Sequence, residues 1–329
     1  MKGSRYIFKS QDLRDISAVK WIPESGEPII GAVQIFHGMA EHIERYEDFA
    51  LYLNSKGFVV VGHDHRGHGK SLEKEGDTGF FSEKDGWEKV VHDARTVTTH
   101  IRDQHGDIPI FIVSHSMGSF IARDYISRWG DDLAGVILSG TGNQNLALLN
   151  ILGILTRLEI FFRGKRHRSV FLDNLTFKSY NKPYEPEGPT SFEWLSRDRE
   201  QVDRYVADPL CGFICTSSFY QDLARGLKRI CSSSIYSRIP KDLPLFLYSG
   251  DDDPVGGIKG SLVKEVYENY RKAGIRDVSL VLNPGGRHEN LNESNRLEVY
   301  DTFHKWLIDH VSEDIQKNDD LKAGEFLAT

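Results

Sequence analysis

Short apolar runs recur along the chain, separated by longer segments in which apolar positions lie three or four residues apart. The runs are rich in Val, Ile, Leu and Phe, which is typical of strands buried on both faces of a parallel sheet. They occupy residues 58–63, 109–114, 133–138, 244–249 and 277–282. Two further runs near the N-terminus, SRYIFKS and SAVKWIP, are expected to form an antiparallel edge of the same sheet.

The segments between these runs have the spacing of amphipathic helices. Tyr46, Phe49 and Leu53 share one helical face, and the same spacing appears in residues 120–129 and 299–307. Because strands alternate with helices, the pattern predicts an α/β fold with a mostly parallel sheet.

This alternation stops between residues 142 and 242. The stretch has helical patterns with Pro and Gly punctuation but no clear buried strand, so we expect a helical cap inserted over the carboxyl edge of the sheet. The alternative is that it adds irregular layers to the main domain. The predicted organisation is a core of residues 1–141 and 243–312, a cap of residues 142–242 and a frayed tail of residues 313–329.

Composition and charge narrow the class of protein. In 329 residues, 27% are charged and 39% hydrophobic, as in a packed, soluble protein. The net charge of −7 disfavours nonspecific nucleic-acid binding, which needs a basic face. The sequence shows no apolar signal-peptide core and no bilayer-spanning segment. Three cysteines without paired spacing predict reduced, mostly buried thiols and a cytoplasmic protein: Cys211, Cys215 and Cys231.

A candidate nucleophile lies in the sequence IVSHSMGSF. Ser116 follows a predicted strand and precedes a predicted helix, whose free N–H groups and dipole would face a developing negative charge. Gly118 permits close backbone approach, but Ser114 stands where such turns usually have a first glycine. The turn by itself fits either a catalytic serine or an ordinary serine-rich turn.

A serine nucleophile needs a base, and the base needs an orienting acid. Both types follow later strands, in the order Ser, Asp, His. The loop GDDDPV offers three adjacent aspartates, residues 251–253, and the loop NPGGRHEN offers His288, a residue type that titrates near neutral pH. Pro254 restricts the backbone before it, which favours a fixed Asp253.

Four motifs together resemble the α/β-hydrolase family, in its monoacylglycerol lipase and lysophospholipase branch, which is also grouped with serine aminopeptidases. The resemblance covers roughly residues 5–311 and implies an α/β-hydrolase fold: a mostly parallel eight-stranded sheet, flanking helices and a helical cap. The motifs are HGMAEH (37–42), GHDHRGHGKS (62–71), SHSMG (114–118) and the late pair GDDDPV (250–255) with GGRHE (285–289).

The resemblance also assigns roles to residues. It implies Ser116 as the nucleophile, His288 as the base and Asp253 as the acid. The backbone N–H groups that bind the oxyanion map to Met39 and Met117, whose side chains would be free to line a pocket. Ser114 departs from the family pattern, which affects the geometry of the turn rather than the class of reaction.

The histidine-rich loop HDHRGHG has a spacing of histidines similar to that of a metal-binding loop. Gly67 stands where a paired-zinc loop has an aspartate, and no further ligands of suitable spacing are apparent. In the resembling family this loop is structural, with Asp64 and Arg66 as polar ties. We therefore expect neither a metal nor a cofactor. The histidines concerned are His63, His65 and His68.

The predicted cap opens with a strongly apolar segment, residues 146–162, followed by a basic run. One interpretation is that the apolar side covers the active site and the basic run is a solvated turn. The other is a transient contact with a membrane surface that carries anionic headgroups. Both place apolar surface near Ser116, which suits an acyl chain. The basic residues are Arg163, Lys165, Arg166 and Arg168.

These features predict a serine hydrolase that cleaves carboxylic esters of single-chain lipids, such as a monoacylglycerol or a lysophospholipid. The oligomeric state and the acyl chain length stay open. An acyltransferase would use the same triad, and a noncatalytic protein would typically lack a triad member. Ser116 argues against dehalogenases and epoxide hydrolases, which have an aspartate there. An aminopeptidase would need a cap carboxylate to bind the free amine; candidates are Glu159, Glu185, Glu187, Glu193 and Asp198.

Overall fold

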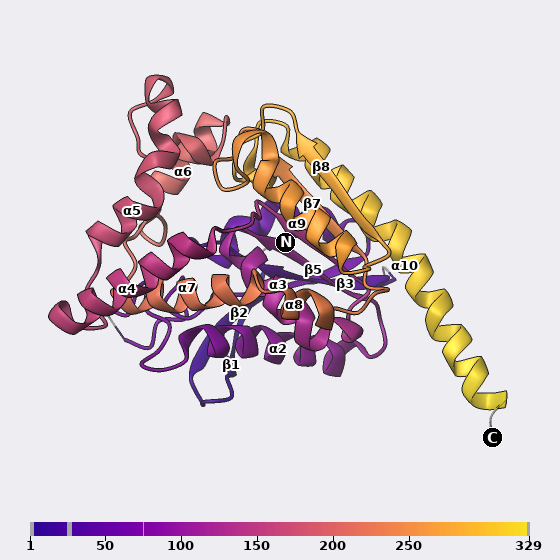
Figure 1. Cartoon of the computed structure of the whole chain (residues 1–329). Coiled ribbons are helices and arrows are strands. Elements are labelled where there is room, and N and C mark those ends of the chain that lie inside the picture. The colour runs from indigo at the N-terminus through magenta and orange to yellow at the C-terminus, as the bar shows by residue number, and fades with distance from the viewer. Residues whose placement is uncertain (1–2, 25–27, 75, 328–329) are drawn as a thin grey trace.

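A computed structural model describes residues 3–24, 28–74 and 76–327, with side chains of the last helix through Val311. One mostly parallel eight-stranded sheet runs through the molecule, in the order β1-β2-β4-β3-β5-β6-β7-β8 (Figure 1). β2 pairs antiparallel with both β1 and β4, and the other neighbours are parallel. The strands are β1 (Ser4–Lys9), β2 (Asp15–Trp21), β3 (Gly31–Phe36), β4 (Phe58–His63), β5 (Ile110–His115), β6 (Gly135–Ser139), β7 (Leu245–Gly250) and β8 (Val278–Asn283).

The predicted strands and the antiparallel edge are confirmed, and so is the α/β-hydrolase fold. The strand β3, in the middle of the sheet, was not predicted. It carries the polar residue Gln34, which is fully buried. The Gln34 amide donates to the Ala94 carbonyl, and the Thr98 hydroxyl donates to Gln34. A satisfied polar side chain therefore interrupts the apolar pattern of a central strand.

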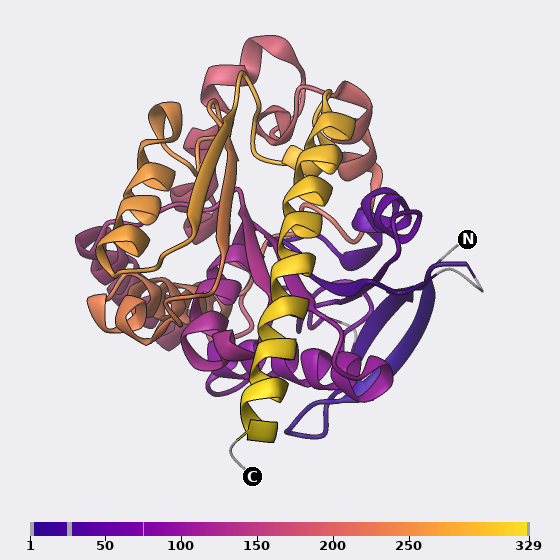
Figure 2. The same ribbon diagram turned by 90° about the vertical axis from the view of Figure 1, so that its right-hand side faces the viewer.

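Helices cover both faces of the sheet. Buried side chains of α1 and α10 pack on one face, and those of α2, α3 and α9 pack on the other. Figure 2 shows α10 crossing its face of the sheet. These helices are α1 (Glu47–Asn54), α2 (Gly86–His105), α3 (Met117–Trp129), α9 (Ser261–Lys272) and α10 (Arg296–Leu327).

The connection between β6 and β7 is helical. In the described part of this connection the only β pairing is an isolated bridge between Arg168 and Thr216. The division into a core and a cap at residues 142 and 242 stays a prediction. The helices are α4 (Leu146–Arg163), α5 (Val170–Asn181), α6 (Arg199–Ala207), α7 (Ser217–Ile230) and α8 (Ser233–Arg238), with 3-10 turns η3 (Lys182–Glu187) and η4 (Glu193–Leu195).

Helix α7 attaches this connection to the core. The carboxylate of Asp124 on α3 is fully buried, and it accepts from Arg229 of α7 at 3.0 Å and from Trp87 of α2 at 2.8 Å. Buried charges are found in proteins when they are paired and hydrogen-bonded in this way. The helices α4 to α6 lie farther out, at one side of the sheet (Figure 1).

Helix α10 runs to Leu327 and so includes most of the segment for which a frayed tail was predicted. Its sequence has neither Gly nor Pro from residue 297 to residue 322, so nothing there breaks the helix. Its last turns project from the body (Figure 1), and the final two residues of the predicted tail lie outside the described residues. No helix in the described ranges has an apolar stretch long enough to cross a bilayer.

Candidate active site

Ser116 lies on the turn between β5 and α3 with φ 50° and ψ −119°. A positive φ is rare for a residue with a Cβ and costs on the order of 1–3 kcal/mol, so surrounding contacts must hold it. The Ser116 N–H donates to the carbonyl of Ser139 on β6 at 2.9 Å. A Cβ at Gly118 would lie 2.2 Å from the Phe36 carbonyl oxygen, so only glycine fits beside this turn.

The serine at position 114 is accommodated without loss of the turn. Its side chain is buried, and its hydroxyl donates to the Ile137 carbonyl on β6 at 2.9 Å. The polar atom is therefore satisfied by the neighbouring strand. The departure from the usual glycine thus leaves the strained backbone of Ser116 intact.

Asp253 and His288 form a buried pair at the ends of β7 and β8, and the two residues are 1% and 2% exposed. His288 Nδ1 donates to the carboxylate, 3.0 Å from both oxygens. Asp253 also accepts from the Ser249 hydroxyl at 3.2 Å and from the Val255 N–H at 2.9 Å. These bonds fix the carboxylate, which in turn fixes the imidazole. The neighbouring Asp251 instead accepts from the Gly285 N–H.

The pair also shifts both pKa values. Burial disfavours the imidazolium, but the Asp253 charge and hydrogen bond outweigh it and raise the pKa of His288 above its usual value. Burial likewise opposes ionisation of Asp253, yet the same interaction and the Val255 N–H lower the pKa of its carboxyl. The arrangement can therefore accept a proton at His288 and keep an anion beside it.

Two rings pack beside the imidazole of His288. The Trp194 ring lies 4.9 Å from the His288 ring, with 33° between the planes. The centre of the His115 ring lies 4.6 Å from the centre of the His288 ring. Burial and then the neighbouring His288 lower the pKa of His115 to about 4, so its ring is neutral near pH 7. These rings restrict His288 to one orientation.

The loop of residues 37–42, between β3 and the 3-10 turn η1 (Ile43–Tyr46), forms the other side of the site. The Glu41 carboxylate accepts from the Gly38 N–H and from the Tyr46 hydroxyl. Arg45 donates to Glu41 at 2.6 Å and to both oxygens of Glu289 at 2.6 Å. Because Glu289 follows His288, this ion-pair network joins the loop to the segment that carries His288.

The two predicted oxyanion donors differ in their surroundings. Met39 is half-buried and lines the cavity described below, as expected. Met117 is the first residue of α3, and its side chain is buried in the main hydrophobic core. The Met117 side chain, which the resemblance leaves free to line a pocket, instead packs in the core. The reason is its place on the inner face of α3, which packs on the sheet.

A cavity of about 370 Å³ opens beside Ser116 and His288. Its apolar walls come from the 37–42 loop and from the connection between β6 and β7. Its polar side comes mainly from α5 and the segment that follows it. The apolar lining residues are Met39, Phe177, Phe192, Trp194, Leu195 and Phe213, and polar ones include Asn174, Lys178, Glu185 and Ser191.

Of the five cap carboxylates considered for binding an amine, Glu185 is the one that lines this cavity. The other four bond to neighbouring side chains or backbone. Glu159 accepts from Ser217, Glu187 from Arg287, Glu193 from Thr190 and Arg199, and Asp198 from the first turn of α6 and from Arg296.

Residues 27–295 match a known family, described as serine aminopeptidase, S33. The chain belongs to this family. It is 28% identical over 292 residues to a monoacylglycerol lipase of Mycolicibacterium smegmatis. The aligned region covers 88% of this chain and 92% of that lipase. Two solved structures are similar over 94% of this chain and 99% of their own. One is a carboxyl esterase from Bacillus coagulans, with a TM-score of 0.85 and 27% identity; the other is a lipase in an open form, with 0.82 and 30%.

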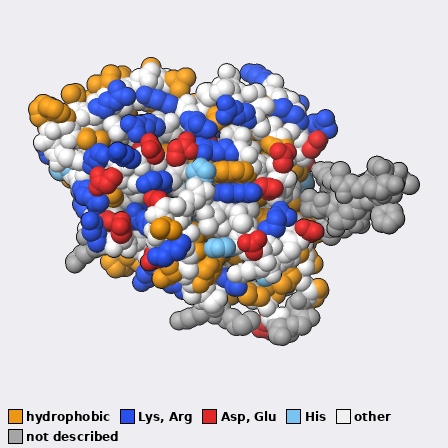
Figure 3. Space-filling model, turned by 90° about the horizontal axis from the view of Figure 1, so that it is seen from below, with side chains coloured by type: hydrophobic (Ala, Val, Ile, Leu, Met, Phe, Trp, Pro, Cys, Tyr) orange, Lys and Arg blue, Asp and Glu red, His pale blue; other side chains and the backbone are white. Residues whose placement is uncertain are grey.

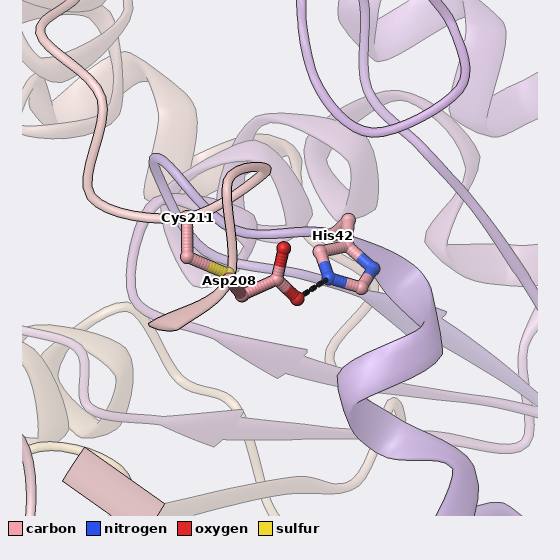
Figure 4. A group of neighbouring side chains, drawn as sticks. All are labelled: His42, Asp208 and Cys211. Carbon is pink, nitrogen blue, oxygen red and sulfur yellow. Dashed lines mark hydrogen bonds and ion pairs between the residues drawn. The ribbon is translucent and has the colours of Figure 1, made fainter. Parts of the chain in front are cut away.

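The histidine-rich loop of this serine aminopeptidase-family chain is structural in its contacts. Arg66 pairs with Asp93 and Asp12, and Asp64 accepts from the Ile43 and Lys70 N–H groups. Its histidines are fully buried, and they do not bring their ligand atoms together. Among the described residues, a different group brings three possible metal-ligand atoms within 4.8 Å of one another. It consists of His42, Asp208 and Cys211 (Figure 4).

Sequence reasoning missed the groups that hold the site together. Arg45 and Glu289 are 244 positions apart, and Trp194 comes from the connection rather than from any motif. The charged residues inside HGMAEHIER offered a signal, since Glu41, Glu44 and Arg45 lie in or next to the predicted oxyanion loop and buried charges require partners.

Proposed function

We propose that this protein is a carboxylic ester hydrolase acting on lipids with a single acyl chain, a monoacylglycerol or a lysophospholipid. The observation that carries this is the buried Asp253–His288 pair, whose histidine lines one cavity together with a strained, half-buried Ser116. The relatives named monoacylglycerol lipase, carboxyl esterase and lipase support the same chemistry.

In this mechanism Ser116 attacks the ester carbonyl while His288 removes its proton, and Asp253 stabilises the imidazolium. The N–H groups of Met39 and Met117 stabilise the oxyanion. The alcohol leaves with the proton from His288, and an acyl-enzyme remains on Ser116. Water then enters, activated by the same histidine, and releases the fatty acid. No metal or cofactor takes part.

The cavity supports an amphipathic substrate. Its apolar walls suit an acyl chain, and burial of each methylene contributes about 0.8 kcal/mol. Its polar side, with Asn174, Lys178 and Ser191, suits a hydroxylated or charged headgroup. Glu185 lies on the same side of the cavity and supports a second candidate function, that of an aminopeptidase, because a carboxylate there could bind a free amine.

We also propose that the outer side of α4 and α5 makes transient contact with a membrane surface. Phe161 and Phe162 are 80% and 76% exposed, and further apolar side chains beside them are about half exposed. Figure 3 shows apolar side chains at the edge of the molecule on the side of α4 and α5, with Lys and Arg side chains nearby. Within the basic run, Arg166 pairs with Asp77 and Glu83, so this part of the run binds the core.

The test is a hydrolysis panel with the purified protein and its Ser116→Ala variant. The panel contains p-nitrophenyl esters of graded chain length, a monoacylglycerol, a lysophospholipid and an aminoacyl-naphthylamide, with an added alcohol to detect acyl transfer. We expect turnover of long-chain esters that disappears in the variant. Cleavage of the naphthylamide alone would favour the aminopeptidase.

The three free cysteines support a reducing compartment, and we propose the cytoplasm.

A further inference from the structure

One residue of the 37–42 loop has a strained backbone of its own. Ala40, next to Met39, has a φ of 52°, in the left-handed region that disfavours residues with a Cβ. Its carbonyl oxygen accepts the Gly212 N–H at 2.9 Å and the Tyr205 hydroxyl at 3.0 Å. Tyr205 is 165 positions away, in α6, and Gly212 follows that helix. The strained turn is therefore held from outside the loop.

The same segment, residues 205–212, makes two more contacts with this region. Asp208 accepts from His42 Nε2 at 2.8 Å (Figure 4), and its other oxygen accepts the Leu210 N–H. The Arg45 guanidinium lies 4.8 Å from the centre of the Tyr205 ring. Four contacts thus join segment 205–212 to residues 40–45.

We propose that segment 205–212 is a positioning element of the hydrolase, in which Tyr205 and Gly212 hold Ala40 in its left-handed turn and so aim the Met39 N–H into the cavity. The inference rests on the proposed function, because it gives that N–H an oxyanion to bind. Its consequence is that the oxyanion site is complete only while the connection between β6 and β7 is seated on the loop. Lifting residues 205–212 alone would break none of the hydrogen bonds between Asp253 and His288 but would disassemble the oxyanion site.

The Tyr205→Phe variant isolates the hydroxyl, because the buried ring and its contact with Arg45 remain. We expect kcat to fall about 5- to 10-fold, the effect of one hydrogen bond, with KM within about 2-fold, since the bound ester has no oxyanion before the serine attacks. The matched control is Tyr236→Phe in α8. Tyr205 and Tyr236 are both 6% exposed, and the Tyr236 hydroxyl bonds to Arg123. We expect its kcat to stay within about 2-fold of wild type.

Rescue separates positioning from general stability. Glycine adopts positive φ without strain, so Ala40→Gly should recover much of the kcat lost in Tyr205→Phe. A role in folding alone would give the same loss with either residue at position 40. Affinity for a trifluoromethyl ketone, which forms an oxyanion adduct with serine, should fall by the same factor as kcat/KM. Fatty-acid product inhibition should not change.

Two results would overturn the inference while the proposed function stands. One is a Tyr205→Phe enzyme with wild-type kcat, and the other is an equal loss in the Ala40→Gly background. If the wild-type protein turns over no ester and binds no trifluoromethyl ketone, the proposed function fails and takes the inference with it. Normal wild-type turnover therefore distinguishes the two failures.

Discussion

The acid–base side and the oxyanion side of the proposed site are held in different ways. Asp253 and His288 follow adjacent strands, β7 and β8, and their bonds come mainly from the same strand ends. The 37–42 loop follows β3, but its strained Ala40 is held by residues of a distant helical connection. Groups fixed by the sheet can be read from strand order, whereas groups fixed by packed connections cannot. The same contrast predicts which parts tolerate movement.

The largest effect is expected on the acid–base side. Asp253→Asn removes the charge that orients and stabilises the His288 imidazolium, so kcat should fall by about 10⁴-fold. The base acts when neutral, and the raised His288 pKa places the acid limb of kcat/KM above pH 6.5. In the variant this limb should move to lower pH. A pH profile with p-nitrophenyl butyrate measures both, and a loss below tenfold would argue against Asp253 as the acid.

Arg45→Met should cause the next largest effect, on stability. The change leaves the Glu41 and Glu289 carboxylates buried without their cation, which costs about 3–5 kcal/mol. Urea unfolding at pH 7 measures the free energy of unfolding. The control is Lys9→Met, whose exposed pair with Asp15 is worth about 1 kcal/mol or less. Equal effects of the two changes would mean that the buried network does not hold the loop.

Acid should lower the free energy of unfolding through buried histidines in and beside the 37–42 loop. Burial lowers the pKa of His37, His63 and His68 to about 3 in the folded state. Between pH 6.5 and about 3 the unfolded chain binds protons that the folded chain does not, so stability falls as pH falls. Each histidine contributes about 1.4 kcal/mol per pH unit.

His63 offers a clean variant, because within the described residues neither of its ring nitrogens has a hydrogen-bond partner. His63→Leu should keep the stability of the protein at pH 7 and reduce the pH dependence by about one proton. Urea unfolding at pH 7, 6 and 5 gives the slope. An unchanged slope would show that His63 is not neutral in the folded protein at these pH values.

The smallest effect on chemistry is expected at the outer side of α4. Replacing Phe161 and Phe162 by serine should leave turnover of a dissolved short-chain ester within about 2-fold, because neither side chain lines the cavity. Turnover of monoacylglycerol in anionic vesicles should fall several-fold, together with vesicle co-sedimentation. Ile258→Ser, at a position that is 89% exposed outside the connection, is the control. Equal losses in both variants would contradict the proposed membrane contact.

The sequence predicted the sheet and the order of the proposed catalytic residues because buried strands have a distinctive apolar pattern. It missed β3, where buried Gln34 breaks that pattern, and it did not separate the roles of Glu185 and the other cap carboxylates. The hydrogen bond from Tyr205 to Ala40 and the ion pair of Arg45 with Glu289 join segments that no local sequence pattern relates. They depend on how the connection and the base loop pack on the core, which periodicity does not encode.

The central claim is that Ser116 forms a covalent acyl-enzyme. The most direct measurement is labelling with an alkyl fluorophosphonate, followed by peptide mass mapping and parallel assay of ester turnover. The account predicts one adduct, on the peptide that contains Ser116, with turnover lost in proportion to labelling. An adduct on another residue, or turnover that persists after Ser116 is fully labelled, would contradict it.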